Sequence, residues 1–413
     1  MEIGITVIVT ILCLLLFIWG ISVAKPHMFH EDYLSIDVMR SMRGLAAIGV
    51  ILHHISQEEV FAAAGELDLF RETGYLFVSL FFFSSGYGLL KNLDNRPDYM
   101  NGFLGRRLPV IVIPYYTSIL FYGIYNIIAR NHLEALQWIT NILGVTAMNE
   151  YAWYPVVLTI LYIAFYLIFR KEGNRRRQLF RLFLVIIALG MIFCIGGHFL
   201  WWAGSGPNWW MNPYGADQKK WWLGQKVFWF SGEWWVNSPI AFLLGMIYET
   251  YEKKLTEFFH KKYPLKMAVL IILTLAADVL TNYTRAVFGF WTEYAGNGPA
   301  ITEKIITYLT QLPHIILFTL FIIVFTMKIR TINPISKFFG KYSLDTYMMN
   351  LMALLIFRPL LLDFPGRIIK DADLAMGSFV ICVFAVTIVL ALIYHKLNEL
   401  LINWIGRLNK VKS

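Results

Sequence analysis

The sequence has few charged residues for its size. Asp, Glu, Lys and Arg make up only 15% of the 413 residues, whereas 58% are hydrophobic. A soluble globular chain usually contains about 25% charged and 45–50% apolar residues. This composition therefore excludes an ordinary soluble protein. It predicts an all-α fold, a polytopic bundle of about 10–11 transmembrane helices that has the lipid bilayer as its surroundings.

Cysteine is also scarce. The three cysteines lie inside apolar runs and show no paired spacing: Cys13, Cys194 and Cys382. They cannot form a disulfide framework or a zinc site, so we expect no bound metal. The net charge of +9 does not indicate a nucleic-acid partner, because the basic residues lie between apolar segments. Membrane topology is the better explanation. The sequence also lacks an internal repeat.

Eleven apolar segments have about the length that spans a bilayer as a helix, 17–25 residues. They cover residues 3–23, 44–62, 74–90, 108–129, 153–169, 182–203, 235–250, 267–284, 311–327, 343–362 and 376–397. The first has no basic n-region and is longer than the apolar part of a signal peptide, which favours an anchor helix over residues 1–24. A membrane domain over 35–400 and a cytoplasmic tail over 401–413 complete the predicted organisation.

Positive charge separates between alternate loops. The loops after the odd-numbered segments, with their borders, contain 26 of the 36 Lys and Arg residues. By the positive-inside rule these loops are cytoplasmic, which places the N-terminus outside and the C-terminus inside. We therefore expect a multi-pass membrane protein. Nothing in the sequence indicates an oligomeric state.

The segment "RGLAAIGVILHH" contains ionisable residues at both ends of an apolar run. Arg43 and His54 are eleven residues apart, so a helix brings them to within about 20° of one face, some 16 Å apart along the axis. An arginine suits an anionic group, and a histidine suits proton transfer. Glu58, four residues later, is expected to orient the ring. A flanking charge at Arg43 and an interhelical hydrogen bond at His54 are the alternative explanations.

This segment and two others together resemble the acyltransferase-3 family of membrane O-acyltransferases, over most of residues 35–400. The family's leading motif is arginine, ten residues, then histidine. A second motif is an aromatic pair followed by Ser-Gly-aromatic, and a third is a basic run leading to proline and aromatics. The matching residues are Arg43 and His54; Phe81, Phe82, Ser85, Gly86 and Tyr87; and Arg106, Arg107, Pro114, Tyr115 and Tyr116. "FFGKYSLDTYMMN" (338–350) resembles a further family helix.

The resemblance implies an O-acetyltransferase that takes an acyl group, most often acetyl, from cytoplasmic acyl-CoA. The acceptor would be a hydroxyl of a cell-surface polysaccharide or a lipid-linked glycan. The membrane implied by the resemblance is the plasma membrane. Acetyl-CoA is then a donor substrate and no permanently bound cofactor is expected. His54 would be the general base, and Arg43 would position the donor's anionic end.

Further donor contacts are predicted on the cytoplasmic side. Arg106 and Arg107 suit the CoA phosphates, as does Lys341 more weakly, although the positive-inside bias explains all three equally well. The stretch Ser85-Gly86-Tyr87 would bind the thioester or pantetheine; the alternative is a small-residue site of helix packing.

Two positions depart from the family pattern. Ser79 stands where an acidic residue is usual, and Asn350 stands where the last motif usually has histidine. These departures leave an inactive scaffold subunit as one alternative. The main alternative is a transporter or exporter of a polysaccharide or small solute, with Asp278 in mid-helix as part of its path.

Tryptophan is concentrated in one predicted outer loop. Residues 201–235 contain nine of the fourteen tryptophans. Most are expected to form an interfacial belt. A subset is predicted to line a cleft for the sugar acceptor: Trp209, Trp210, Trp221 and Trp222.

Overall fold

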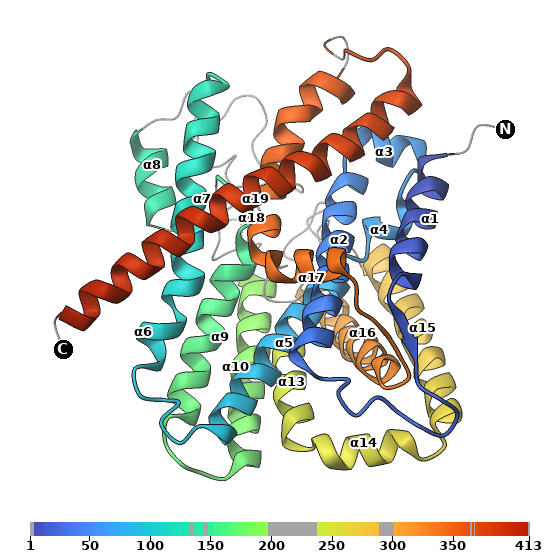
Figure 1. Cartoon of the computed structure of the whole chain (residues 1–413), viewed down its shortest axis with the longest axis vertical. Helices are drawn as coiled ribbons and strands as arrows, with labels where there is room; N and C mark the ends of the chain where they lie inside the picture. Colours follow the sequence, from blue (N-terminus) through green and yellow to red (C-terminus); the bar gives the residue numbers. More distant parts are fainter. Residues whose placement is uncertain are drawn as a thin grey trace. The chain divides into compact units, whose positions relative to one another are not determined.

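The computed structural model describes residues 4–131, 135–143, 148–149, 151–196, 238–288, 301–363, 366 and 368–411. Helices dominate this part of the chain, which confirms the all-α prediction (Figure 1). Each of the eleven predicted apolar segments coincides, wholly or in part, with a helix. The four candidate acceptor tryptophans lie outside the described residues.

The chain forms two compact units. The first comprises Met1–Leu80 and Phe325–Ser413, and the second comprises Phe81–Val324. The first unit contains α1 (Ile5–Ile18), β1 (Ile21–Val23), α2 (Ile36–Ser56), α3 (Glu59–Ala64), α4 (Asp68–Arg71), the start of α5 (Gly74–Asn95), β2 (Ile329–Thr331), α17 (Pro334–Lys341), α18 (Ser343–Phe357), the π-helix η3 (Arg358–Leu362) and α19 (Ala372–Val411).

The second unit contains the rest of α5 and a further series of helices. These are α6 (Phe103–Arg107), α7 (Pro109–Ile128), α8 (Ala135–Ile142), α9 (Trp153–Phe169), α10 (Arg175–Gly196), α13 (Ile240–Thr250), α14 (Glu252–His260), α15 (Tyr263–Phe288) and α16 (Ile301–Thr326).

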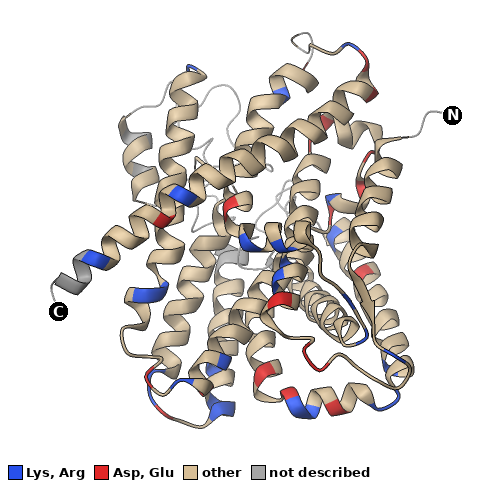
Figure 2. Ribbon diagram, in the orientation of Figure 1, with Lys and Arg blue, Asp and Glu red and all other residues tan. Residues whose placement is uncertain are grey.

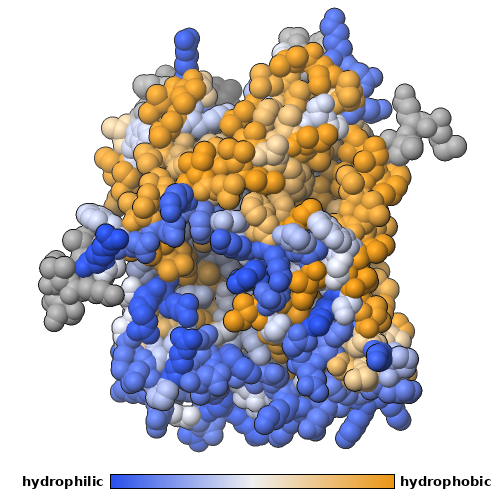
Figure 3. Space-filling view, in the orientation of Figure 1, coloured by the Kyte–Doolittle hydropathy of each residue, from blue (hydrophilic) through white to orange (hydrophobic). Residues whose placement is uncertain are grey.

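Six of the described helices are long and apolar enough to cross a membrane. They are α5, α7, α15, residues 305–326 of α16, α18 with η3, and residues 372–407 of α19. Helix α15 exposes apolar side chains such as Ile272 and Val279, which are 64% and 67% exposed. Figure 3 shows hydrophobic residues over α1 and most of α18, and hydrophilic residues over α14. A multi-pass membrane protein follows.

Helices α2 and α17 pack backbone against backbone. A Cβ atom on Gly44 would overlap the carbonyl of Ser336, and one on Gly340 would overlap the carbonyl of Arg40. Small residues allow this close approach. Helix α18 packs against both α2 and α19 (Figure 1). The first unit therefore has α2 and α18 at its centre.

The N-terminal segment is tied to the region before α17. Strands β1 and β2 pair antiparallel, with Ile21 opposite Thr331. Asn333 caps α17 and donates from Nδ2 to the carbonyls of Leu16 and Trp19, each at 2.9 Å. Beside the strands, a hydrogen bond from Arg330 lowers the pKa of Asp32. Helix α1 is thus an integral part of its unit.

In the second unit, α5 and α13 also meet through glycines. A Cβ on Gly86 would overlap the carbonyl of Phe242, and one on Gly245 would overlap the carbonyl of Phe83. The next helix, α14, carries charges of both signs (Figure 2). It is a polar connection between apolar helices.

Candidate active site

Helix α2 carries Arg43 and His54 on one stripe, three turns apart. The helix begins where the Ser35 side chain accepts a hydrogen bond from the backbone N–H of Val38, and it continues for 21 residues without a proline. His54 is buried, with 7% of its surface exposed, and Arg43 is half-buried. The predicted placement of these two residues on one helix is confirmed.

The ring of His54 is held by Asn350 from α18. His54 Nδ1 lies 3.1 Å from Asn350 Oδ1, and Asn350 is fully buried. An amide oxygen can only accept a hydrogen bond, so Nδ1 is the donor. In the neutral ring the second nitrogen, Nε2, is then unprotonated. This is the form that a general base requires.

Two aromatic neighbours surround this ring. The centroids of His53 and Tyr347 lie 5.3 and 6.4 Å from that of His54. His53 Nδ1 donates to the carbonyl of Phe70 at 2.9 Å, and a Cβ on Gly74 would overlap the His53 ring. His53 therefore connects α2 to α4 and to the first residue of α5.

Glu58 does not lie on α2 as the sequence predicted. The helix ends at Ser56, and Glu58 takes an extended conformation as the N-cap residue of α3. Both of its carboxylate oxygens accept from Arg358, from Nε and Nη2, at 2.7 Å. The polar run that follows Ile55 ended the helix earlier than its apolar length suggested. The carboxylate is thus engaged with η3.

A second histidine pairs with α18 and was missed in the sequence analysis. His395 Nδ1 on α19 donates to Asp345 Oδ2 at 2.9 Å, and its ring meets Tyr342 edge-on at 4.8 Å. Lys341 lies 4.8 Å above the same Tyr342 ring. The sequence does contain a sign of this pair: Asp345 and His395 are ionisable residues within two apolar segments, where such residues are energetically costly.

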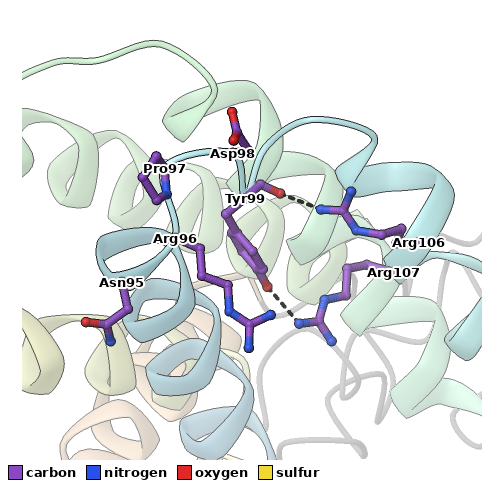
Figure 4. A pocket seen from close by; sticks show the side chains of 7 residues that line it. All are labelled: Asn95, Arg96, Pro97, Asp98, Tyr99, Arg106 and Arg107. Atoms are coloured by element: carbon purple, nitrogen blue, oxygen red, sulfur yellow. Dashed lines mark hydrogen bonds between the residues drawn. The ribbon is translucent and has the colours of Figure 1, made fainter.

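Arg106 and Arg107 lie at a pocket of about 580 Å³ in the second unit (Figure 4). Arg106 donates to the carbonyl of Tyr99 at 2.7 Å, and Arg107 donates to the Tyr99 hydroxyl at 2.9 Å. Figure 4 shows the Tyr99 ring between the side chains of Arg96 and Arg107. Three arginines and one carboxylate, that of Asp98, line this pocket, which leaves it electropositive.

The Ser85-Gly86-Tyr87 stretch lies on α5 in the second unit. Gly86 faces the α13 backbone, as described above, and the Tyr87 hydroxyl donates to Glu252 at 2.9 Å. Lys91 donates to the same carboxylate oxygen at 2.8 Å. The close approach of α5 to α13 therefore explains the glycine at position 86. Ser85, on the same helix, is half-buried.

Two further polar residues noted in the sequence, Asp278 and Ser79, have local partners. Asp278 lies 3.6 Å from Nε2 of the buried His314 and accepts from Asn282 at 3.2 Å. Ser79 is buried and donates to the carbonyl of Leu76 at 2.6 Å. Asp278 is thus part of a polar pair. In the described part of the chain, no group of three or more His, Cys, Asp and Glu residues is arranged to hold a metal ion.

Comparisons with known proteins add one finding. A family model described as an acyltransferase domain matches residues 33–396. The match includes α2, the arginine pocket, α18 and α19 as far as Lys396. The searches found no matching curated protein and no matching solved structure.

Proposed function

Because this chain belongs to the acyltransferase-3 family, and is thus a membrane acyltransferase, we propose that it transfers acetyl from cytoplasmic acetyl-CoA to a carbohydrate hydroxyl. The acceptor is extracytoplasmic or lipid-linked. The proposal depends on His54, which is buried and hydrogen-bonded through Nδ1 to Asn350. Arg43 lies on the same helix, α2. The positive-inside rule supports a cytoplasmic position for the arginine end of α2, and the membrane would be the plasma membrane.

His54 would act as the general base. Its Nε2 takes the proton of the acceptor hydroxyl while the hydroxyl oxygen attacks the carbonyl carbon of the thioester. The C–S bond then breaks with its electron pair on sulfur, and the imidazolium returns the proton to the leaving thiolate. Arg43 would bind an anionic part of the donor, because its guanidinium is always charged.

The arginine pocket would hold the phosphates of CoA. Guanidinium groups form strong, charge-assisted hydrogen bonds to phosphate. Arg106 already donates to backbone carbonyls, of Asn101 and Tyr99, so its main contribution is to shape the loop. Arg107 donates to a side-chain hydroxyl and Arg96 is exposed, which leaves both able to meet a ligand.

The proposal is tested with purified protein in lipid and radiolabelled acetyl-CoA. We expect loss of thioester that a crude cell-surface glycan extract stimulates, with the label recovered on glycan. CoA should also raise the unfolding midpoint of the protein. A folded protein that transfers no label and whose midpoint does not respond to CoA would contradict the proposal and favour a transporter.

Arg107→Ala is expected to raise the KM for acetyl-CoA about tenfold with kcat within about twofold. The reason is the loss of one hydrogen bond to a charged group, which is worth about 1.5–3 kcal/mol. Steady-state kinetics measure the effect, and inhibition by pantetheine, which has no phosphate, should not change. Lys253→Ala on α14 removes an equal charge as the control. An unchanged KM in folded Arg107→Ala would show that the pocket does not bind the donor.

A further inference from the structure

Asn350 accepts a hydrogen bond from His54 that bears on which ring nitrogen holds the proton. It is fully buried in α18, as are its chain neighbours Met348, Met349, Leu351 and Met352. Its Oδ1 lies 3.1 Å from His54 Nδ1. An amide that is buried this completely requires a reason beyond packing.

Packing alone does not explain the amide. Within the described residues, Nδ2 of Asn350 is buried and has no hydrogen-bond partner. Buried donors without partners are rare and lower stability. A leucine of similar volume would avoid that loss. The polar group is therefore retained at the expense of stability, which is common at functional sites.

The chemistry of the contact supplies the reason. A neutral imidazole has its proton on either nitrogen, and the hydrogen bond made by one nitrogen determines the state of the other. An amide oxygen at Nδ1 selects the Nδ1–H tautomer and leaves Nε2 unprotonated. Because the amide is neutral, it fixes the ring without adding a negative charge beside it.

We propose that Asn350 is the positioning residue of His54. It holds the ring, through Oδ1, in the tautomer whose Nε2 accepts the proton of the acceptor hydroxyl. This inference rests on the proposed function, in which His54 is the base. It also gives a role to a position where the sequence departs from its family's usual histidine.

Other titratable and charged groups lie on α2, on α18 and on the segments that follow α2. His53 is on α2 itself, and Tyr347 is on α18. Arg71 of α4 donates to the carbonyl of Ser56, and Glu58 pairs with Arg358 of η3. None of these is altered in the variants below, so a change in pH dependence reports on position 350.

Two substitutions of Asn350 separate positioning from structure. Asn350→Leu removes the acceptor, and we expect kcat to fall about 100-fold with the KM for acetyl-CoA within twofold. Asn350→Asp keeps an acceptor and adds a charge that stabilises the imidazolium. The acidic limb of its kcat/KM profile should move to higher pH by about one unit. The control is Thr387→Val, which removes another buried polar group without a partner in the described residues and should leave both values unchanged.

A measurement without turnover completes the test. Nitrogen-15 NMR of histidine-labelled protein in lipid, compared with His54→Ala, should show His54 protonated at Nδ1. Asn350→Leu should show a mixture of tautomers. The proposal is overturned if wild-type His54 is protonated at Nε2, or if folded Asn350→Leu keeps its kcat. It is also overturned if the Asn350→Asp profile does not move. A wild-type protein that transfers no acetyl contradicts the proposed function instead.

Discussion

Replacing His54 by alanine is expected to lower kcat for acetyl transfer by about 10²–10⁴-fold, the usual contribution of general acid–base catalysis. The KM for acetyl-CoA should change little, because the base acts on the acceptor hydroxyl. Initial rates of label transfer to glycan measure the effect. The unfolding midpoint, read in the same lipid, establishes that the variant is folded.

His53→Ala is the matched control for His54→Ala. His53 is the adjacent residue on α2, and its Nδ1 is engaged with the carbonyl of Phe70. Its loss should lower stability moderately and leave kcat within a few-fold of the wild-type value. Equal kcat losses in the two folded variants would mean that the helix as a whole, and not Nε2 of His54, supports the reaction. Full activity of folded His54→Ala would exclude it as the base.

Gly44→Ala is expected to lower the unfolding midpoint strongly and to reduce activity with it. A methyl group at this position overlaps the carbonyl of Ser336, and neither backbone can yield alone. Overpacking in a dense core costs typically about 1–3 kcal/mol. Since α2 carries His54 and Arg43, the displaced helix also misplaces the site.

Gly377→Ala in α19 provides the comparison for Gly44→Ala. A Cβ there meets nothing within 4 Å, so the same substitution should be neutral or should stabilise the helix by about 0.5–1 kcal/mol. Thermal unfolding in lipid measures both variants. If the Gly44→Ala protein were as stable as Gly377→Ala, α2 and α17 would not be packed so closely that a methyl group is excluded.

Local periodicity was sufficient to predict the helix of the candidate site. Arg43 and His54 lie within one uninterrupted helix. At 3.6 residues per turn, their separation of eleven residues places both side chains on one stripe. The apolar segments could be predicted as helices for a similar reason. In lipid, the backbone N–H and C=O groups of each segment have to form hydrogen bonds within that segment. These features depend on residues close together in the chain.

The partners of the site depend on contacts between distant segments. Asn350 is 296 residues from His54, and Arg358 is 300 residues from Glu58. No spacing rule joins such positions. Glu58 was expected beside His54 because the apolar run was extended past Ser56, where the helix ends. The hydrogen bond from His54 to Asn350 depends on the packing of α18 against α2, which local sequence patterns do not predict.

Glycines illustrate the same limit in the second unit. Gly86 in a Ser-Gly-Tyr stretch was compatible with either a ligand or a neighbouring helix, and its own sequence gave no means of deciding. The carbonyl of Phe242, from α13, occupies the space beside it. Helix packing therefore accounts for Gly86, and Arg107 in the electropositive pocket becomes the more informative position for studying the donor.

The separation of His54 from Asn350 has a consequence for biosynthesis. A ribosome adds about 5–20 residues per second, so the 296 residues between them take about 15–60 s. During that interval α2 exists without the helix that holds its histidine, and without α17 beside Gly44. A chain arrested before α17 leaves this face of α2 uncovered. The first unit, and with it the candidate base, is completed only after α17 and α18 have been synthesised.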